Sequence, residues 1–205
     1  MNSLNTSPKI AFAFAGTFLF LAGALVLMGI ITGEVFYPAP YSTSTNEISD
    51  LGATKPPDSI IYQPSATIFN LTMILTGIMI LIATYFVHVI YRRIPITLSI
   101  GFLGLGALGV GLFPGNNPVT HPIFSLLTFI SGGLAAILSA LILRAPFRYI
   151  APCFGIVGLT SLFMSSSLMP ILGDGGVERW VAYPIVLWII GFGGYLLGSQ
   201  PLQQE

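Results

Sequence analysis

The chain alternates between long apolar stretches and short polar intervals. Six stretches stand out, at about residues 10–32, 67–90, 95–113, 122–143, 149–170 and 179–199. At 1.5 Å per residue, each makes a helix of roughly 30 Å, the thickness of the hydrocarbon core of a bilayer. The strands of a membrane barrel would be segments of about 10 residues with alternating polarity. The pattern therefore predicts an all-α fold, a polytopic bundle of six transmembrane helices.

Composition supports a membrane protein and limits the number of domains. Charged residues make up 7% of the 205 residues, against roughly 25% in soluble domains. Six crossings leave no room for a separate soluble domain, so residues 1–205 are predicted to form one. The net charge is zero, and no basic patch points to nucleic acid. Cys153 is the single cysteine, which excludes an internal disulfide and a cysteine metal cage.

Charged residues in the intervals predict the orientation. The first stretch is too long for a cleaved signal peptide, so it is interpreted as a retained helix. With a cytoplasmic N-terminus, the inside receives Lys9, Arg92, Arg93, Arg144 and Arg148. The outside then receives Lys55 and Arg179. This bias follows the positive-inside rule and predicts a multi-pass protein of the cell membrane with both termini cytoplasmic.

The interval at residues 33–66 is much longer than the others and is extracytoplasmic in this orientation. A loop of this length inside a compact protein is usually either functional or disordered. Five apolar or aromatic residues favour a folded cap over the bundle: Ile48, Leu51, Ile60, Ile61 and Tyr62.

Small residues recur on single faces of three stretches. These sets are Gly104, Ala107 and Gly111; Ser131, Ala135 and Ser139; and Gly191, Gly194 and Gly198. Such spacing lets the backbones of membrane helices approach closely. We favour internal packing, while a homo-oligomer interface remains an alternative.

No Asp, Glu, Lys or Arg lies in the middle of any stretch, which counts against pumps, voltage sensors and proton-coupled transporters. The remaining polar residues gather toward the outside, among them Asn70 and Ser125. They are expected either to line a cavity that opens outward or to make helix–helix hydrogen bonds.

Three outer segments carry the residues best suited to catalysis or ligand binding: Asp50, His121, Asp174 and Glu178. If they meet, they suit acid–base catalysis or a divalent cation. The structural alternative is that the acids cap helices and turns, and that His121 hydrogen-bonds to its own turn. His88, the other histidine, lies toward the opposite side, so a multi-histidine zinc site is not expected. No Gly-x-Ser-x-Gly motif marks a serine nucleophile.

An ordered set of motifs resembles a known family. It comprises Asn46, Ile48-Ser49-Asp50-Leu51-Gly52, Phe69-Asn70, Leu112-Phe113-Pro114-Gly115-Asn116 and His121. The set resembles small six-helix prokaryotic membrane proteins of domain-of-unknown-function family 998, which are similar to DRAM-type membrane proteins. The latter include factors that remodel lipid anchors, so the resemblance implies lipid handling. It also implies that Asp50, Asn70, Asn116 and His121 belong to one site. The family supplies no established catalytic residues.

The leading hypothesis is an extracytoplasmic polar site that binds a lipid or lipid-linked head group, with modification of that group left open. Asp50 and His121 would act as the base or ligand pair, and Asn70 and Asn116 would position the substrate. Arg179 would pair with a phosphate or with Glu178. Ser125, Asp174 and Glu178 complete the binding set, and no metal or cofactor is assigned. The expected partners are membrane lipids, a second copy or another membrane protein. The alternatives are a non-catalytic subunit or assembly factor, and a facilitator for a small neutral solute.

Overall fold

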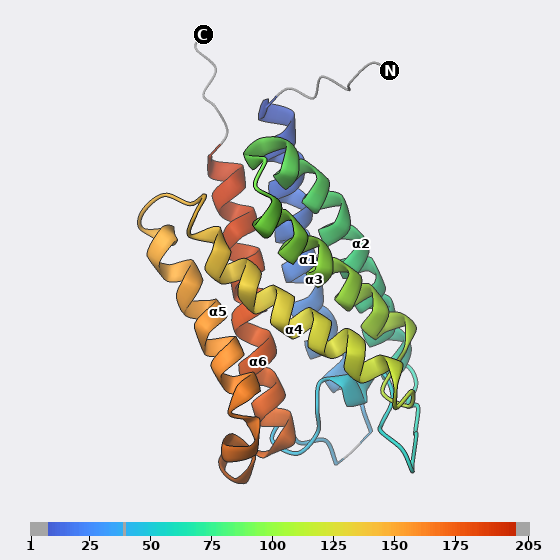
Figure 1. Ribbon diagram of the computed structural model, residues 1–205. Helices are drawn as coiled ribbons and strands as arrows, with labels where there is room; N and C mark the ends of the chain where they lie inside the picture. Colours follow the sequence, from blue (N-terminus) through green and yellow to red (C-terminus); the bar gives the residue numbers. More distant parts are fainter. Residues whose placement is uncertain (1–7, 39, 200–205) are drawn as a thin grey trace.

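The computed structural model describes residues 8–38 and 40–199 (Figure 1). Six α-helices and one short 3-10 helix, η1, make up the regular structure of these residues. They are α1 Pro8–Val35, η1 Ser49–Leu51, α2 Ser65–Tyr91, α3 Ile94–Leu112, α4 Thr120–Ser139, α5 Phe147–Phe163 and α6 Ser165–Gly198. The all-helical fold predicted from the sequence is confirmed.

The helices form a closed ring in chain order. Each helix packs against the next, and α6 returns to pack against α1. The start of α1 and the end of α6 lie at one end of the bundle, which we call the terminal end (Figure 1). The cap loop, residues 36–64, covers the opposite end, which we call the cap end. The α3–α4 and α5–α6 connections also lie there.

Five helices are long and apolar enough to cross a membrane. The sixth, α5, has 17 residues and spans about 25 Å, the short limit for a crossing. The expected segment 149–170 is wrong at its end because the chain turns at Met164, where φ is −98° and ψ is 14°. Residues 165–172 are helical but precede a break at Gly173, where φ is 74°. The expected segment 122–143 also extends too far, since α4 ends at Ser139.

The outer face of the bundle is apolar, as a membrane requires. On α2, Leu71, Leu75 and Ile78 recur at helical spacing and are 40–51% exposed. The opposite face of α2 buries Phe69 and Ile80 in the bundle. A helix that is apolar on both faces is typical of a protein whose outer surface meets lipid.

Large side chains close the terminal half of the bundle. Trp188 and Phe192 of α6 are fully buried and stack with ring centroids 5.5 Å apart. The Trp188 Nε1–H donates a 3.2 Å hydrogen bond to the Ser139 hydroxyl of α4. In turn, the Ser139 hydroxyl donates to the Ala136 carbonyl. The polar groups at this depth therefore have partners within the protein.

The small-residue faces have different roles. A methyl group at Gly111 would meet Ile74 and the Asn70 carbonyl of α2, so the α3 face packs internally. A methyl group at Gly194 or Gly198 would meet none of the described residues within 4 Å. Internal packing is therefore wrong for that part of the α6 face. The close crossing of α1 and α6 instead uses Gly16 and Gly193.

The cap loop is folded onto the bundle through η1. Leu51 is fully buried and Ile48 is 5% exposed, and both join a core cluster with Val26, Phe69 and Met73. Two other apolar residues expected in the cap, Ile60 and Ile61, are 40% and 50% exposed.

Candidate functional site

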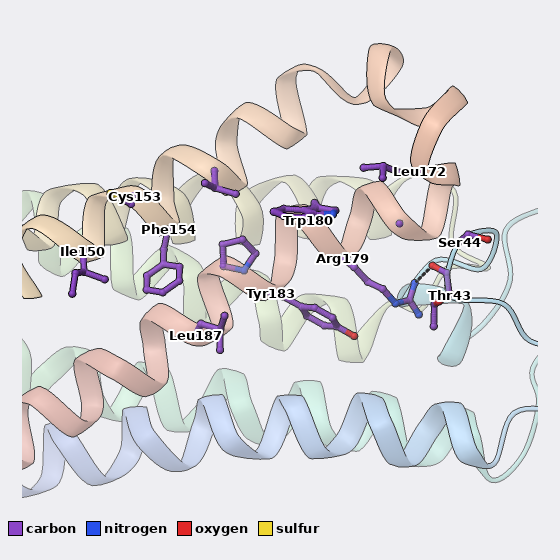
Figure 2. A pocket seen from close by; sticks show the side chains of 13 residues that line it. Thr43, Ser44, Ile150, Cys153, Phe154, Leu172, Arg179, Trp180, Tyr183 and Leu187 are labelled. Atoms are coloured by element: carbon purple, nitrogen blue, oxygen red, sulfur yellow. Dashed lines mark hydrogen bonds between the residues drawn. The ribbon is translucent and has the colours of Figure 1, made fainter.

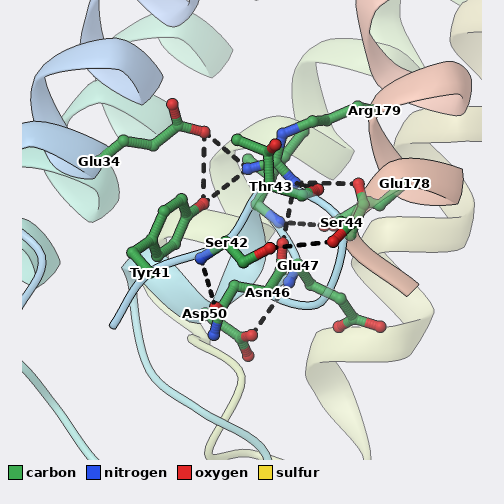
Figure 3. Close-up of polar contacts among 12 residues, drawn as sticks. Glu34, Tyr41, Ser42, Thr43, Ser44, Asn46, Glu47, Asp50, Glu178 and Arg179 are labelled. Carbon is green, nitrogen blue, oxygen red and sulfur yellow. Dashed lines mark hydrogen bonds and ion pairs between the residues drawn. The ribbon is translucent and has the colours of Figure 1, made fainter. Parts of the chain in front are cut away.

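Arg179 of α6 fastens the cap loop to the bundle (Figure 3). Its Nη1 donates to the carbonyls of Thr43, Asn46 and Gly175 at 2.8–2.9 Å. Its Nη2 donates to the Glu34 carboxylate and the Tyr41 hydroxyl, each at 2.6 Å. From the sequence, Arg179 was predicted to pair with a phosphate or with Glu178. Pairing with Glu178 is wrong, because the carboxylate bonded to Arg179 belongs to Glu34 at the end of α1.

Glycines let the cap loop approach α6 at backbone distance. The Gly175 N–H donates to the Ser44 carbonyl at 3.0 Å, and the Gly176 N–H donates to the same oxygen at 3.3 Å. A methyl group at Gly175 would collide with the Asn46 carbonyl. The positive φ at Gly173 favours glycine there as well.

Glu178 and Asp50 organise η1. The Glu178 Oε2 accepts hydrogen bonds from the Ile48 and Ser49 N–H groups at the start of η1. The Asp50 Oδ2 accepts from the N–H of Glu47, the residue before the N-cap of η1, at 3.0 Å. Burial, followed by the nearby Glu47 carboxylate, raises the pKa of Asp50 above its ordinary value.

His121 is buried at the start of α4 with both ring nitrogens engaged. Its Nδ1 lies 2.8 Å from the Phe113 carbonyl, which only accepts, so Nδ1 carries a proton. In the neutral ring, Nε2 then accepts from the Ser125 hydroxyl at 3.3 Å. The Asn117 Oδ1 accepts from the Thr120 N–H at 3.1 Å and caps the helix that carries this pair.

A cavity of about 220 Å³ lies at the cap end between the cap loop, α4 and the α5–α6 segment. We call it the cap-end cavity. Its polar lining is Glu47, Ser49, Lys55, His121, Ser125, Ser165, Asp174 and Glu178. Its apolar lining is Pro122, Leu126, Phe129, Leu162, Met169, Val177 and Val181. Lys55 is paired with Glu47 at 2.6 Å, and among the described residues neither Asp174 nor Glu178 has an ion-pair partner.

The cavity brings together four of the eight residues that the sequence selected: His121, Ser125, Asp174 and Glu178. The other four do not line it. Asn70 lies against Gly52 beneath the cap, where its buried Oδ1 has no hydrogen-bond partner among residues 8–38 and 40–199. Asn116 is exposed in the α3–α4 turn. Asp50 bonds to the backbone before η1, and Arg179 bonds to the cap loop, as described above.

Six residues that shape the cavity region were not selected as site residues from the sequence: Glu34, Tyr41, Glu47, Ser49, Lys55 and Ser165. Glu34 and Tyr41 hold Arg179, and Lys55 holds Glu47. The available signal was the charge of Glu34 and Lys55 in an otherwise charge-poor chain. Within residues 8–38 and 40–199, no group of three or more His, Cys, Asp or Glu side chains is arranged to hold a metal ion.

A second hollow, a groove of about 750 Å³, runs along the outer face between α5 and α6 (Figure 2). Ile150, Phe154 and Leu187 lie along its apolar length. Thr43 and Arg179 lie at its cap end. The Arg179 guanidinium already serves the cap loop, so the groove is mainly an apolar surface.

Comparison with known proteins identifies the family of this chain. The model of the family described as "Protein of unknown function (DUF998)" matches residues 20–195. The chain belongs to the DUF998 family. No curated protein and no solved structure matches it. The matched region contains α2–α5, the cap loop and every residue of the cap-end cavity. This DUF998 chain is thus an integral membrane protein, and the resemblance to DRAM-type proteins stays a prediction.

Proposed function

We propose that this protein binds a membrane amphiphile whose head group occupies the cap-end cavity. One observation carries the proposal: the lining is divided by chemistry. Charged and hydroxyl groups come from the cap loop, the first two turns of α4, the start of α6 and the turns that follow the break at Gly173, whereas Leu126, Phe129 and Leu162 come from the membrane helices α4 and α5. A head group that prefers hydrogen bonds and a chain that prefers apolar contacts fit the two sides.

By the positive-inside rule, the cap end faces outward, so the ligand would come from the outer leaflet. In that orientation the wall of the cavity formed by α4, α5 and the start of α6 would be the side next to lipid. Met169, which lines the cavity there, is 42% exposed. A lipid-side approach suits a molecule that already resides in the membrane.

The structure offers little support for a facilitator of neutral solutes. The polar residues that the sequence offered for a path were Thr76, Thr84 and Ser139. The Thr84 hydroxyl donates to the Ile80 carbonyl, and Ser139 bonds Ala136 and Trp188. Two of these three hydroxyls are thus satisfied within the protein, and the third, that of Thr76, lines a small internal chamber. Catalysis by an Asp50–His121 pair also lacks support, because the His121 partners are Phe113 and Ser125.

Native mass spectrometry of the protein released from mild detergent tests the proposal. Met169→Trp fills the cavity from its exposed rim, and Ser125→Leu fills it from α4. The matched control is Ser99→Leu on α3, whose hydroxyl bonds only its own helix and does not line the cavity. We expect wild type and the control to retain a bound amphiphile and both cavity variants to lose most of it. Equal retention by all four proteins would overturn the proposal.

A further inference from the structure

A small internal chamber lies below the cap-end cavity, inside the ring of helices. Its volume is about 80 Å³, and α1, α2, α3, α4 and α6 all contribute to its wall. Ser49, Ser125, Phe129 and Glu178 line both hollows. The chamber therefore adjoins the cap-end cavity, with Glu178 at the junction.

The chamber wall is mostly apolar. It includes Val26, Met73, Leu103, Ala107 and Ile189. Ligand pockets for whole drug-sized molecules are roughly 300–1,000 Å³, so this chamber admits only a slender segment of a ligand. A single hydrocarbon chain fits that description, and a pair of chains does not.

Polar atoms in the chamber wall have partners, with one exception. The hydroxyls of Ser125 and Thr128 bond to His121 and to the Phe124 carbonyl. Thr76 on α2 is 2% exposed, and within the part of the chain that the structure describes its buried Oγ1 has no hydrogen-bond partner. A buried hydroxyl left unpaired costs free energy, and native structures rarely leave one so. Thr76 lies near the middle of α2, well below Glu178, so it marks a place for a polar atom deep in an apolar chamber.

The charges at the mouth of the chamber select the head group. Among the described residues, the Glu178 carboxylate is bonded only by two backbone N–H groups and has no cationic partner. Asp174 adds a second carboxylate to the cavity, while Lys55 forms an ion pair with Glu47. An ammonium or hydroxyl head group finds acceptors here, whereas a phosphate or carboxylate meets like charge.

We infer that the ligand is a single-chain amphiphile with an amine head group at Glu178, whose chain enters the chamber and presents a hydroxyl or carbonyl to Thr76. This inference rests on the proposed function and names the chemical class of its ligand. Glu178 accepts from the head group, the apolar walls enclose the chain, and the Thr76 hydroxyl gains the hydrogen bond that it lacks.

A series of amino alcohols of increasing length, with the amine and hydroxyl at opposite ends, tests this inference. Plain alkylamines and alkyl phosphates of the same lengths serve as comparison ligands. Binding is measured by calorimetry in detergent for wild type, Thr76→Val and Glu178→Gln. Thr84→Val is the matched control, because its hydroxyl bonds only its own helix.

We expect an optimum length at which the amino alcohol binds about fivefold tighter than the alkylamine, as one hydrogen bond supplies. Thr76→Val should remove that preference and leave alkylamine binding unchanged, and Thr84→Val should change neither. Glu178→Gln should weaken both amines and spare the phosphates. If the preference survives in Thr76→Val, or if phosphates bind as well as amines, the inference is wrong. The proposed function would then stand as long as Met169→Trp still abolishes binding. If no amphiphile binds wild type, both fall.

Discussion

Arg179 of α6 donates a 2.6 Å hydrogen bond to the carboxylate of Glu34 at the end of α1, 145 residues away in the chain. The pair closes the ring of helices at the cap end. Because the same guanidinium also bonds Tyr41 and three backbone carbonyls, one side chain joins α1, α6 and the cap loop.

Replacing Arg179 by Met should lower the free energy of unfolding by about 3 kcal/mol, since it leaves the part-buried Glu34 without its partner. The comparison is Arg93→Met, at an exposed position between α2 and α3, which should change stability by less than about 0.5 kcal/mol. Thermal unfolding in detergent measures both. Equal melting temperatures for the two variants would show that the ion pair does not hold the cap.

Gly175→Ala should destabilise the protein by about 1–3 kcal/mol, because the methyl group collides with the Asn46 carbonyl. It should also speed proteolysis within the cap loop. Gly194→Ala is matched in chemistry and lies in the same helix, but its methyl group meets no described residue within 4 Å. That variant should be neutral or gain up to about 1 kcal/mol from helix propensity. A Gly175 variant as stable as the Gly194 variant would argue against close seating of the loop.

Asp50 should make the cap sensitive to pH. Its pKa in the folded protein lies above 3.8, because burial and the Glu47 carboxylate disfavour ionisation. Its contribution to stability is therefore complete below pH 3.8 and is lost as the pH rises through the folded pKa. Asp50→Asn stays uncharged and should lack this loss. Melting temperatures across pH report the difference, with Asp58→Asn at an exposed loop position as the control.

Thr76→Val should raise the melting temperature of ligand-free protein, because it removes a buried hydroxyl without a partner. A gain of about 1 kcal/mol is expected. Thr84→Val should give no gain, since the Thr84 hydroxyl is already bonded to Ile80. Destabilisation by Thr76→Val in ligand-free protein would mean that the hydroxyl has a partner in the chamber.

The predicted orientation is testable with the single cysteine removed. Cys153 is exposed and would itself react with a maleimide, so the labelling is done in the Cys153→Ser variant. In that background, Thr45→Cys in the cap loop should react with a membrane-impermeant maleimide added to intact cells. Arg148→Cys, at the terminal end, should react only after the cells are opened. The reverse pattern would place the cap end in the cytoplasm.

The helices were predictable because long apolar runs in a membrane have few other structures available. Their ends were less predictable. The run at 149–170 is apolar throughout, so hydropathy cannot reveal the turn at Met164 or the break at Gly173. Those features follow from backbone angles and from the cap loop that packs against Gly173 and Gly175.

Half of the candidate site could be predicted, for a physical reason. His121 and Ser125 are four residues apart on one helix, so local geometry places them together. Asn116 was selected from its turn motif, yet Asn117 caps α4. The partnership of Glu34 with Arg179 depends on closure of the ring, and no local pattern in the chain encodes that.

The contacts that hold residues 43–46 against α6 have an evolutionary consequence. Arg179, Gly175 and Gly176 donate hydrogen bonds to the backbone carbonyls of Thr43, Ser44 and Asn46 rather than to their side chains. Main-chain atoms are the same for nearly every amino acid, so the side chains of Thr43 and Ser44 can change while the path of the segment stays fixed. Asn46 is different, because its Oδ1 accepts a hydrogen bond from the Ser42 N–H. Because Thr43 and Ser44 line the cap end of the groove between α5 and α6, substitutions there can reshape the groove without rebuilding the scaffold beneath.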